Sequence, residues 1–253
     1  MATAAPALAG QTALVTGGAR RVGAEIVKHL HAAGATVAIH YRNSHAAALA
    51  LAEECNALRA GSAAIFSADL LRTESIPALI AAVTERCGGP HILINNASSF
   101  YPTPFGQLTS AHWTDLMGSN LMAPLFLAQA AASALRRAHG AIVNIVDIHG
   151  LRPLPGYIVY STAKAALIHL TKALARELAP EVRVNGIAPG PVLWPDAGVD
   201  EAQRQEIIRS TLLQRSGTPA DVARAVCFFA TAPFVTGQIL AIDGGRSLRW
   251  SAS

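Results

Sequence analysis

Three side chains that can hold or transfer a proton stand at fixed spacings in the run VDIHGLRPLPGYIVYSTAKAAL. Tyr160 and Lys164 are four residues apart, so in a helix they share one face. The Lys164 ammonium can then lower the pKa of the phenol and make it a proton donor. Asp147, thirteen residues before Tyr160, adds a carboxyl group to this set.

Asp147 bears on the kind of bond that such a set would reduce. Carbonyl reduction develops an alkoxide, and an ionised Asp147 beside it would repel this charge and raise the pKa of the Tyr160 phenol, against the effect of Lys164. Reduction of a C=N bond leaves a nitrogen that needs a proton, and a carboxylic acid hydrogen-bonded to the phenol helps to supply it. Asp147 therefore favours an imine-like substrate; the alternative is a drifted, inactive site.

Seven short apolar runs position these residues, with helix-length stretches rich in Ala and Leu between most of them. The runs are TALVTG, TVAIHY, AAIFSAD, HILINNAS, AIVNIVD, VRVNGIA and QILAID. Continuous rather than alternating apolar residues indicate strands covered on both faces. No linker divides the 253 residues. We therefore predict one domain over residues 1–253, an α/β Rossmann-type doubly wound parallel sheet of about seven strands with helices on both faces.

Ligands of such a sheet bind beyond the carboxyl ends of its strands. The candidate ligand-binding residues of this sequence are expected at this edge of the sheet, because each of them follows a predicted strand. They are Gly17, Arg42, Asp69, Asn96, Asp147 and Pro189.

The first strand is followed by the glycine-containing loop TGGARRVG, residues 16–23, which opens into the helix EIVKHLHAA. Glycines such as Gly17 let the backbone approach a pyrophosphate, and a helix N-terminus offers free N–H groups to it. The strand before the loop and the helix after it favour a nucleotide site over a simple tight turn.

The second strand ends in HYRNS, where a cofactor without a 2′-phosphate would usually meet an acidic residue on its ribose. This segment has no acidic residue, and arginine and hydroxyl groups would hold the additional phosphate, so NADP(H) is predicted. The predicted contacts are Arg20, Arg21, His40, Tyr41, Arg42, Asn43 and Ser44, although His40 is expected to be chiefly structural. Alternatively, the arginines are solvated surface residues and Ser44 caps the next helix.

Asp69 and Leu70 follow the third strand and could contact the adenine, with Asp69 accepting a hydrogen bond from its amino group. An N-cap or turn role explains Asp69 equally well.

Composition excludes several classes of function. The net charge is only +4 and the Lys and Arg residues are scattered, so a nucleic-acid surface is not expected. There is no run of eighteen apolar residues and no charged leader, so we expect a cytoplasmic protein that binds no membrane. Three distant cysteines and nine histidines form no metal pattern, and no metal is predicted.

Six ordered motifs resemble the short-chain dehydrogenase/reductase family over nearly the whole chain. They are TGGARRVG, NNAS at residues 95–98, Asn120 in the first turn of a helix, YSTAK at 160–164, APG at 188–190, and TGQ then DGG near the end. The resemblance makes Tyr160 the proton donor, Lys164 the group that binds the ribose and lowers the phenol pKa, and Asn120 the holder of a water. Most members have Ser where this chain has Asp147. The loop residue Val22 and the motif residues Asn96, Ala97, Pro189 and Gly190 are expected cofactor contacts.

Within that family, four features look like pteridine reductases: Arg21 in place of a further glycine, the HYRNS segment, NASSFYPTP after the fourth strand, and the Asp/Tyr/Lys set. The resemblance implies that Phe100 stacks on one face of a pterin and that Ser98 and Arg21 contact cofactor phosphate and pterin polar atoms. A flat heteroaromatic ring would gain from such stacking. Alternatively, Phe100 and Tyr101 fill the small core of their own loop.

After APG come Pro191-Val192-Leu193-Trp194-Pro195 and the polar helix VDEAQRQEIIRS. We expect residues 191–215 to form the substrate loop, with Leu193 and Trp194 touching the substrate. A surface anchor explains Trp194 equally well. His149, two residues after Asp147, is expected to be a loop residue.

The predicted function is NADPH-dependent reduction of a pterin C=N bond, dihydropterin to tetrahydropterin, with dihydrofolate as a second substrate. Resemblance also implies a homotetramer built on helices around residues 120–137 and 157–179, with Arg249 of the C-terminal tail a candidate to reach a neighbour's site. The rivals are a generic carbonyl reductase, such as a 3-oxoacyl thioester enzyme, and a non-catalytic NADPH-binding regulator.

Overall fold

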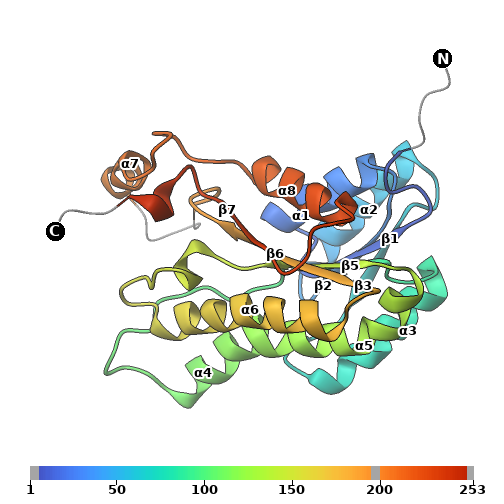
Figure 1. Ribbon diagram of the computed structural model, residues 1–253, viewed down its shortest axis with the longest axis horizontal. Helices are drawn as coiled ribbons and strands as arrows, with labels where there is room; N and C mark the ends of the chain where they lie inside the picture. Colours follow the sequence, from blue (N-terminus) through green and yellow to red (C-terminus); the bar gives the residue numbers. More distant parts are fainter. Residues whose placement is uncertain (1–5, 195–199, 250–253) are drawn as a thin grey trace.

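A seven-stranded parallel sheet forms the centre of the protein (Figure 1), and a computed structural model describes residues 6–194 and 200–249. The strands lie in the order β3-β2-β1-β4-β5-β6-β7. Their bounds are β1 (Thr12–Val15), β2 (Thr36–Tyr41), β3 (Ala63–Ser67), β4 (Ile92–Asn95), β5 (Ala141–Ile145), β6 (Arg183–Pro189) and β7 (Ile239–Ile242). All seven predicted runs are strands, which confirms the predicted single-domain Rossmann-type fold.

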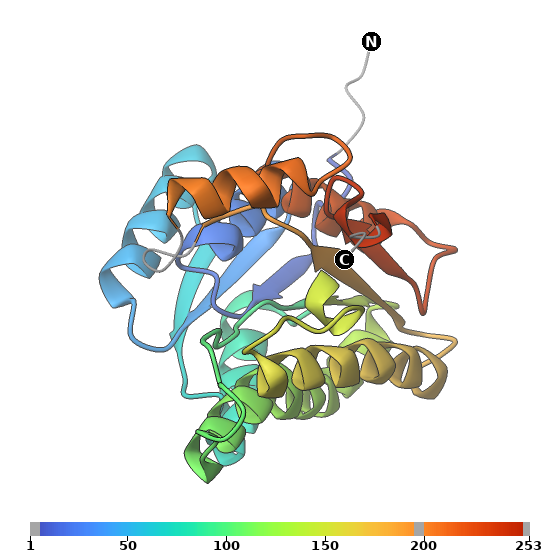
Figure 2. The same ribbon diagram turned by 90° about the vertical axis from the view of Figure 1, so that its left-hand side faces the viewer.

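Helices cover both faces of the sheet (Figure 2). They are α1 (Arg21–Ala32), α2 (His45–Leu58), α3 (Ile76–Cys87), α4 (Ser110–Met117), α5 (Ala123–Arg137), α6 (Ile158–Glu177), α7 (Glu201–Arg209) and α8 (Pro219–Thr231). Helices α1, α2 and α8 contribute to the hydrophobic cluster on one face, and α3, α5 and α6 to the cluster on the other. Short 3-10 turns occupy η1 (Thr73–Ser75), η3 (Ile148–Gly150) and η4 (Arg246–Leu248), and a π-helical turn, η2, spans Gly118–Met122.

The sheet is buried on both faces, as its continuous apolar strands predict. All residues of β1, β4 and β5 are buried. Successive side chains of one strand point to opposite faces, so Leu14 joins the α3/α5/α6 cluster while Val15 joins the α1/α2/α8 cluster. Complete burial of a Val, Leu or Ile side chain stabilises the fold by about 1.5–3 kcal/mol relative to exposure.

The strand order reverses at β1, which has β2 as its neighbour on one side and β4 on the other. At such a reversal of strand order, ligands bind outside the carboxyl ends of the strands. Helix α7 and the C-terminal turn η4 lie at this end of the molecule (Figure 2). Pro189 was predicted to follow a strand, but it is itself the last residue of β6.

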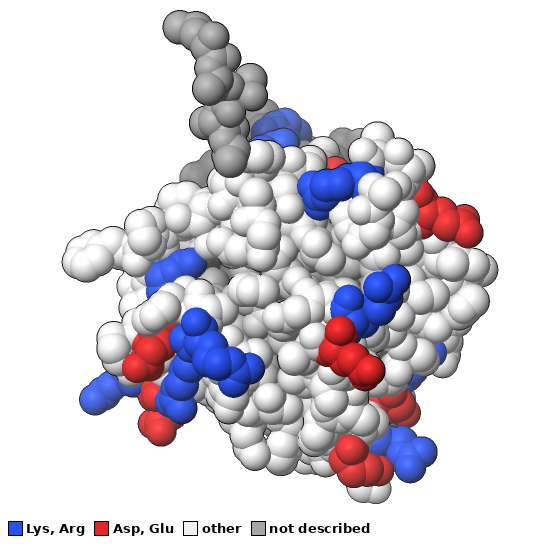
Figure 3. Space-filling model, turned by 90° about the vertical axis from the view of Figure 1, so that its right-hand side faces the viewer, with Lys and Arg blue, Asp and Glu red and all other residues white. Residues whose placement is uncertain are grey.

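The opposite end of the molecule carries basic and acidic side chains interspersed on a mostly uncharged surface (Figure 3). Opposite charges therefore neighbour one another on this face, in keeping with their scatter along the sequence. Within the described ranges, no helix is long and apolar enough to cross a membrane.

Candidate active site

A cavity of about 810 Å³ lies at the carboxyl ends of the central strands. Strands β1, β4, β5 and β6 contribute through the residues that follow or end them, such as Gly17 after β1 and Asp147 after β5. The predicted site residues that line the cavity are Gly17, Arg20, Arg21, Val22, Asn96, Ala97, Ser98, Phe100, Asp147, Tyr160, Lys164, Pro189, Gly190, Leu193 and Trp194.

Asp147, Tyr160 and Lys164 meet on one wall of this cavity. The Tyr160 hydroxyl donates a hydrogen bond of 2.8 Å to Asp147 Oδ2, and the His149 backbone N–H donates one of 2.8 Å to Oδ1. Both carboxylate oxygens are therefore held in place. Tyr160 and Lys164 lie on α6, and Lys164 Nζ donates to the carbonyl oxygen of Ile145 at the end of β5, at 2.9 Å.

Burial sets the acid–base properties of the two helix residues. It raises the pKa of the Tyr160 phenol well above its usual value, and the Asp147 charge and hydrogen bond act in the same direction. Burial also lowers the pKa of Lys164 to about 8, which the charge of Asp147 partly opposes. The expected lowering of the Tyr160 pKa by Lys164 is therefore wrong in this protein, because burial and the neighbouring carboxylate dominate. At neutral pH Tyr160 carries its proton.

Asn120 was predicted in the first turn of a helix but lies in the π-helical turn between α4 and α5. Its side-chain amide donates hydrogen bonds to the carbonyl oxygens of Ser99 and Leu116, both at 3.0 Å. Its own carbonyl oxygen is buried and has no partner among the described residues. Such an oxygen can accept a hydrogen bond from a water, the role that the resemblance implies, although Asn120 does not line the cavity.

The phosphate loop is packed so closely that it requires glycine. A Cβ atom on Gly23 would lie 2.2 Å from the carbonyl oxygen of Gly17 and 2.7 Å from Nδ2 of Asn96. Asn96 Nδ2 donates to the carbonyl oxygens of Thr16 and Gly17, at 2.9 and 3.1 Å, and so ties β4 to this loop. The result is an open backbone cradle at the N-terminus of α1, which suits a pyrophosphate.

His40 supports the loop from beneath. It is buried, its Nδ1 accepts a hydrogen bond of 3.1 Å from the Gly17 N–H, and its Nε2 donates to the carbonyl oxygen of Ala68, also at 3.1 Å. Burial lowers its pKa to about 4, so the ring is neutral, as this pattern of one acceptor and one donor requires. His40 thus has the structural role that we expected and does not line the cavity.

Arg21 has a backbone φ of +55°, a conformation that glycine adopts most easily. Arg21 Nη2 donates a hydrogen bond of 2.9 Å to the carbonyl oxygen of Trp194, which links the phosphate loop to the substrate loop. The Trp194 ring is partly buried and lies 5.7 Å from the Arg204 guanidinium of α7, so both Trp194 and Leu193 lie at the cavity and not on a remote surface. Pro195 and residues 196–199 of the predicted loop lie outside the described residues.

The segment after β2 lies outside the cavity lining. Arg42 and Asn43 are exposed, and Tyr41 and Ser44 are partly buried. Ser44 occupies the N-cap position of α2 but makes no capping hydrogen bond, so the alternative role proposed for it is wrong. Their exposure leaves these groups accessible to the outer end of a bound dinucleotide.

Asp69 belongs to a turn, whereas Leu70 belongs to the hydrophobic core. Asp69 Oδ1 accepts a hydrogen bond of 3.1 Å from the Leu71 N–H, which is the turn role, and lies 4.0 Å from Arg42 Nη1. Leu70 is buried in the α3/α5/α6 cluster. Neither residue lines the cavity.

Phe100 and Tyr101 point to different places. Phe100 is 43% exposed, lines the cavity, and stacks on Tyr157 with ring centroids 4.7 Å apart and an interplanar angle of 17°. Its ring also meets the Tyr160 ring edge-on at 4.8 Å. Tyr101 packs into a small cluster with Leu116 of α4. Only Tyr101 therefore fills the core of the loop, and Phe100 presents an aromatic surface beside the Tyr160 ring.

Several lining residues were missed by sequence reasoning. Tyr157 is the N-cap residue of α6, three residues before Tyr160, and it lines the cavity. His149 was expected only to form a loop, yet it lines the cavity. Arg246 of η4 also lines it, and the signal was its position just after the DGG motif at the end of the last strand.

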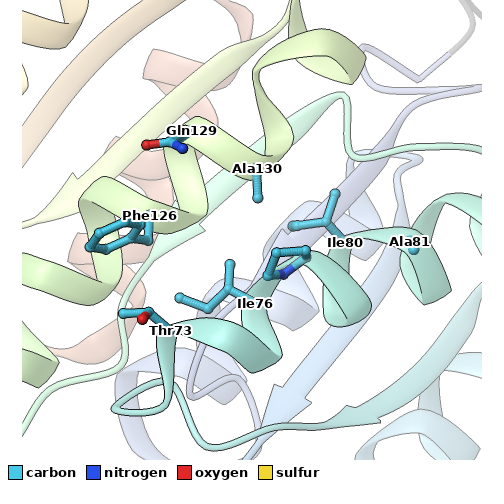
Figure 4. A pocket seen from close by; sticks show the side chains of 8 residues that line it. Thr73, Ile76, Ile80, Ala81, Phe126, Gln129 and Ala130 are labelled. Atoms are coloured by element: carbon cyan, nitrogen blue, oxygen red, sulfur yellow. The ribbon is translucent and has the colours of Figure 1, made fainter.

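A smaller hollow of about 350 Å³ lies between α3 and α5, away from these residues (Figure 4). Phe126 and Ala130 of α5 face Ile76 and Ile80 of α3 across it. Its lining has no titratable side chain, so it offers no acid or base. In the described part of the chain, no group of three His, Cys, Asp or Glu residues could hold a metal ion.

The fold and the cavity together define a class of protein. A glycine cradle at a helix N-terminus, at the switch point of a parallel sheet, holds the phosphates of a dinucleotide. A buried Tyr and Lys beside that cradle provide a proton donor and a cation. This combination is that of a nicotinamide-dependent oxidoreductase.

Comparisons with known proteins identify the family. A family model described as enoyl-(acyl carrier protein) reductase matches residues 17–247. The chain is 36% identical to pteridine reductase 1 of Leishmania tarentolae, over 93% of this chain and 96% of the relative. It is 32% identical to dihydromonapterin reductase of Klebsiella pneumoniae, over 93% and 96%, and 34% identical to a 3-oxoacyl-(acyl-carrier-protein) reductase of Staphylococcus aureus, over 93% and 97%. The protein belongs to the short-chain dehydrogenase/reductase family.

Proposed function

We propose that this protein is an NADPH-dependent pteridine reductase, which converts a dihydropterin to the tetrahydropterin and accepts dihydrofolate as a second substrate. The observation that carries the proposal is the 2.8 Å hydrogen bond between the Tyr160 hydroxyl and Asp147 in the wall of the cavity. Similarity to a pteridine reductase and to a dihydromonapterin reductase supports it.

The residues at the cavity fit a dinucleotide cofactor. The cradle around Gly17 and Gly23 suits its pyrophosphate, and the buried Lys164 ammonium suits hydroxyl groups of its nicotinamide ribose. When bound, NADPH supplies the hydride that reduces the carbon of the C=N bond.

The Asp147–Tyr160 pair supplies the proton that the nitrogen of this bond requires. If Tyr160 acted alone, it would become a phenolate next to a carboxylate, and like charges at hydrogen-bond distance oppose one another. When the Asp147 carboxyl group carries a proton, the hydrogen bond runs from Asp147 to the Tyr160 oxygen, the reverse of the bond in the free protein, and the phenol O–H is directed at the substrate nitrogen. The carboxyl proton then moves to the Tyr160 oxygen as the phenol proton moves to that nitrogen. The products are then a neutral tyrosine and one carboxylate, which the His149 N–H already stabilises.

The aromatic ring of the substrate has a suitable surface beside this pair. Phe100 and Tyr157 form a stacked aromatic wall next to Tyr160. Offset stacking of aromatic rings contributes about 0.5–1.5 kcal/mol beyond the burial of area. Ser98 and Arg21, near the phosphate loop, would hydrogen-bond to the polar edge of a pterin.

A carbonyl reductase is the second candidate, because the Staphylococcus relative is a 3-oxoacyl-(acyl-carrier-protein) reductase. Asp147 disfavours this function, since its carboxylate helps to raise the pKa of Tyr160 and would repel a developing alkoxide.

The test compares dihydrobiopterin, dihydrofolate and an acetoacetyl thioester at equal concentrations, with turnover followed by the loss of NADPH absorbance. The wild type should reduce the pterins, and Asp147→Ala should lower kcat by about 100-fold or more with unchanged affinity for NADPH. If the protein is instead the carbonyl reductase, Asp147→Ser should raise ketone turnover rather than abolish activity. Thioester turnover without pterin turnover in the wild type would refute the proposal in favour of the carbonyl reductase.

The preference for NADPH over NADH rests on the segment after β2. Residues 41–44 carry no carboxylate, and the exposed Arg42 guanidinium, whose Nη1 lies 4.0 Å from Asp69 Oδ1, can bind a 2′-phosphate. Arg42→Ala should raise KM for NADPH about tenfold and leave KM for NADH nearly unchanged, because a charge-assisted hydrogen bond contributes about 1.5–3 kcal/mol. An equal rise for both cofactors would contradict this assignment.

The proposal includes a homotetramer in the cytoplasm. Leu125 and Phe126 on α5 and Ile158 on α6 are 39%, 36% and 44% exposed, and large apolar side chains so placed suit an interface between copies. Light scattering on a sizing column should give the mass of four chains. Arg249 is exposed in the described C-terminal turn, where its carbonyl oxygen accepts a hydrogen bond of 3.1 Å from Arg152.

A further inference from the structure

Arg246 occupies a turn whose backbone is fixed on several sides. The Asp243 carboxylate accepts hydrogen bonds from the N–H groups of Gly245 and Ser247, at 2.9 and 2.7 Å. Gly245 has a φ of +79°, and a Cβ atom on it would lie 2.8 Å from the Leu212 side chain. The turn therefore packs against the end of the substrate loop, and the position of Arg246 is set by the fold.

The Arg246 side chain is partly buried and lines the same cavity as Asp147. Burial lowers its pKa, and the charges of Asp147 and Asp243 oppose that effect. An arginine remains charged in such surroundings. The two nearby carboxylates are already engaged, Asp243 by the turn and Asp147 by Tyr160 and the His149 N–H. A guanidinium charge is thus presented to the cavity.

The other Lys and Arg residues of the described lining lie at the phosphate loop or beside Tyr160, away from the turn η4. Arg20 and Arg21 belong to the phosphate loop, and Lys164 is buried beside Tyr160 with its ammonium bonded to β5. Asp147 is the one carboxylate among the described lining residues. Arg246 is therefore the arginine of the described lining that lies outside the phosphate loop.

We propose that Arg246 binds an anionic group, a carboxylate or a phosphate, on the substituent of the reduced ring, and so selects acidic pterins over neutral ones. The inference rests on the proposed function. With the polar edge of the ring at Arg21 and Ser98 and its reacting bond at Asp147 and Tyr160, the substituent beyond that bond extends toward Arg246. Without this cation, Asp147 would repel an anionic substituent.

The experiment uses a pair of substrates that differ by one phosphate, dihydroneopterin and dihydroneopterin phosphate, with dihydrofolate as the carboxylate. The wild type should have the higher kcat/KM for the phosphorylated pterin. Arg246→Met should lower kcat/KM for an anionic substrate by about 10- to 100-fold, mainly through KM, as expected for the loss of a charge-assisted hydrogen bond. Neutral dihydroneopterin should change by less than about threefold.

The substrate whose turnover falls in Arg246→Met distinguishes binding of a phosphate from binding of a carboxylate. A loss confined to dihydroneopterin phosphate assigns Arg246 to phosphate, and a loss confined to dihydrofolate assigns it to carboxylate. Arg246→Lys keeps the charge without the bidentate fork, so its kcat/KM for the anionic substrate should lie between the values of Arg246→Met and wild type. This variant also tests the role of Arg246 if Arg246→Met does not fold. Arg224→Met on α8, an exposed arginine that pairs with Asp221, controls for the change in net charge and should match the wild type.

An equal loss on the neutral and the phosphorylated pterin, or no loss on either anionic substrate, would overturn the role of Arg246 while leaving the pteridine reductase intact. Failure of the wild type to reduce any pterin would instead remove the proposed function, and the inference with it.

Discussion

Neutral His40 makes the stability of the fold sensitive to acid. The pKa of this buried imidazole is lowered to about 4 from an ordinary value of 6.5. Below pH 6.5 the unfolded chain therefore binds a proton that the folded protein does not, and stability is lost as the pH falls toward 4. Each unit of pKa difference corresponds to about 1.36 kcal/mol, so the loss is about 2 kcal/mol at pH 5 and about 3 kcal/mol at pH 4.

Urea unfolding of wild type and His40→Asn at several pH values between about 7.5 and 4.5 tests this. Asparagine can still accept the Gly17 N–H but does not titrate, so between these two pH values the variant should lose about 2.5 kcal/mol less stability than the wild type. The carboxylates and other histidines titrate in both proteins and cancel in the difference. If the two free energies of unfolding fall in parallel, His40 is not the neutral support for the phosphate loop that its contacts indicate.

Three further predictions concern the cofactor site and the surface. The free-enzyme kcat/KM for NADPH should decline above about pH 8, because the Lys164 ammonium is present below its pKa of about 8 and lost above it; a profile flat to about pH 10 would contradict this. Gly23→Ala should weaken NADPH binding about tenfold, measured by fluorescence titration, since overpacking costs about 1–3 kcal/mol; affinity within about twofold of wild type would show that the loop can adjust. Phe126→Asp should reduce the mass of the assembly in light scattering, and an unchanged tetramer would remove α5 from the interface.

The elements that position the site could be predicted because their signals are local. Each strand is a continuous apolar run, and Tyr160 and Lys164 reveal their common face through a spacing of four. Asp147 meets them because it follows β5, and the ends of parallel strands gather at one edge. Physical reasoning from residue types was therefore sufficient to bring these three side chains together.

Other parts of the site depend on packing that no local pattern reveals. The stack of Phe100 on Tyr157 joins a loop to the N-cap of α6, and the hydrogen bond from Arg21 to Trp194 joins residues 173 positions apart. The predicted effect of Lys164 on the phenol was wrong because burial, which depends on the complete fold, outweighs the nearby charge. Arg246 directly follows the DGG motif, but only the folded turn around Asp243 shows that its side chain lines the cavity.

The π-helical turn at Gly118–Met122 fixes the number of residues between α4 and α5. It contains an N–H to C=O bond over five residues, from Ala123 to Gly118, and so holds one residue more than an α-helical turn. Removing that residue would restore a regular helix but rotate α5 by about 100° relative to α4. The Asn120 amide would leave Ser99, and the buried Leu127 would turn away from the sheet. Substitutions can accumulate along this helix pair, whereas a single deletion would affect the active site and the core at once.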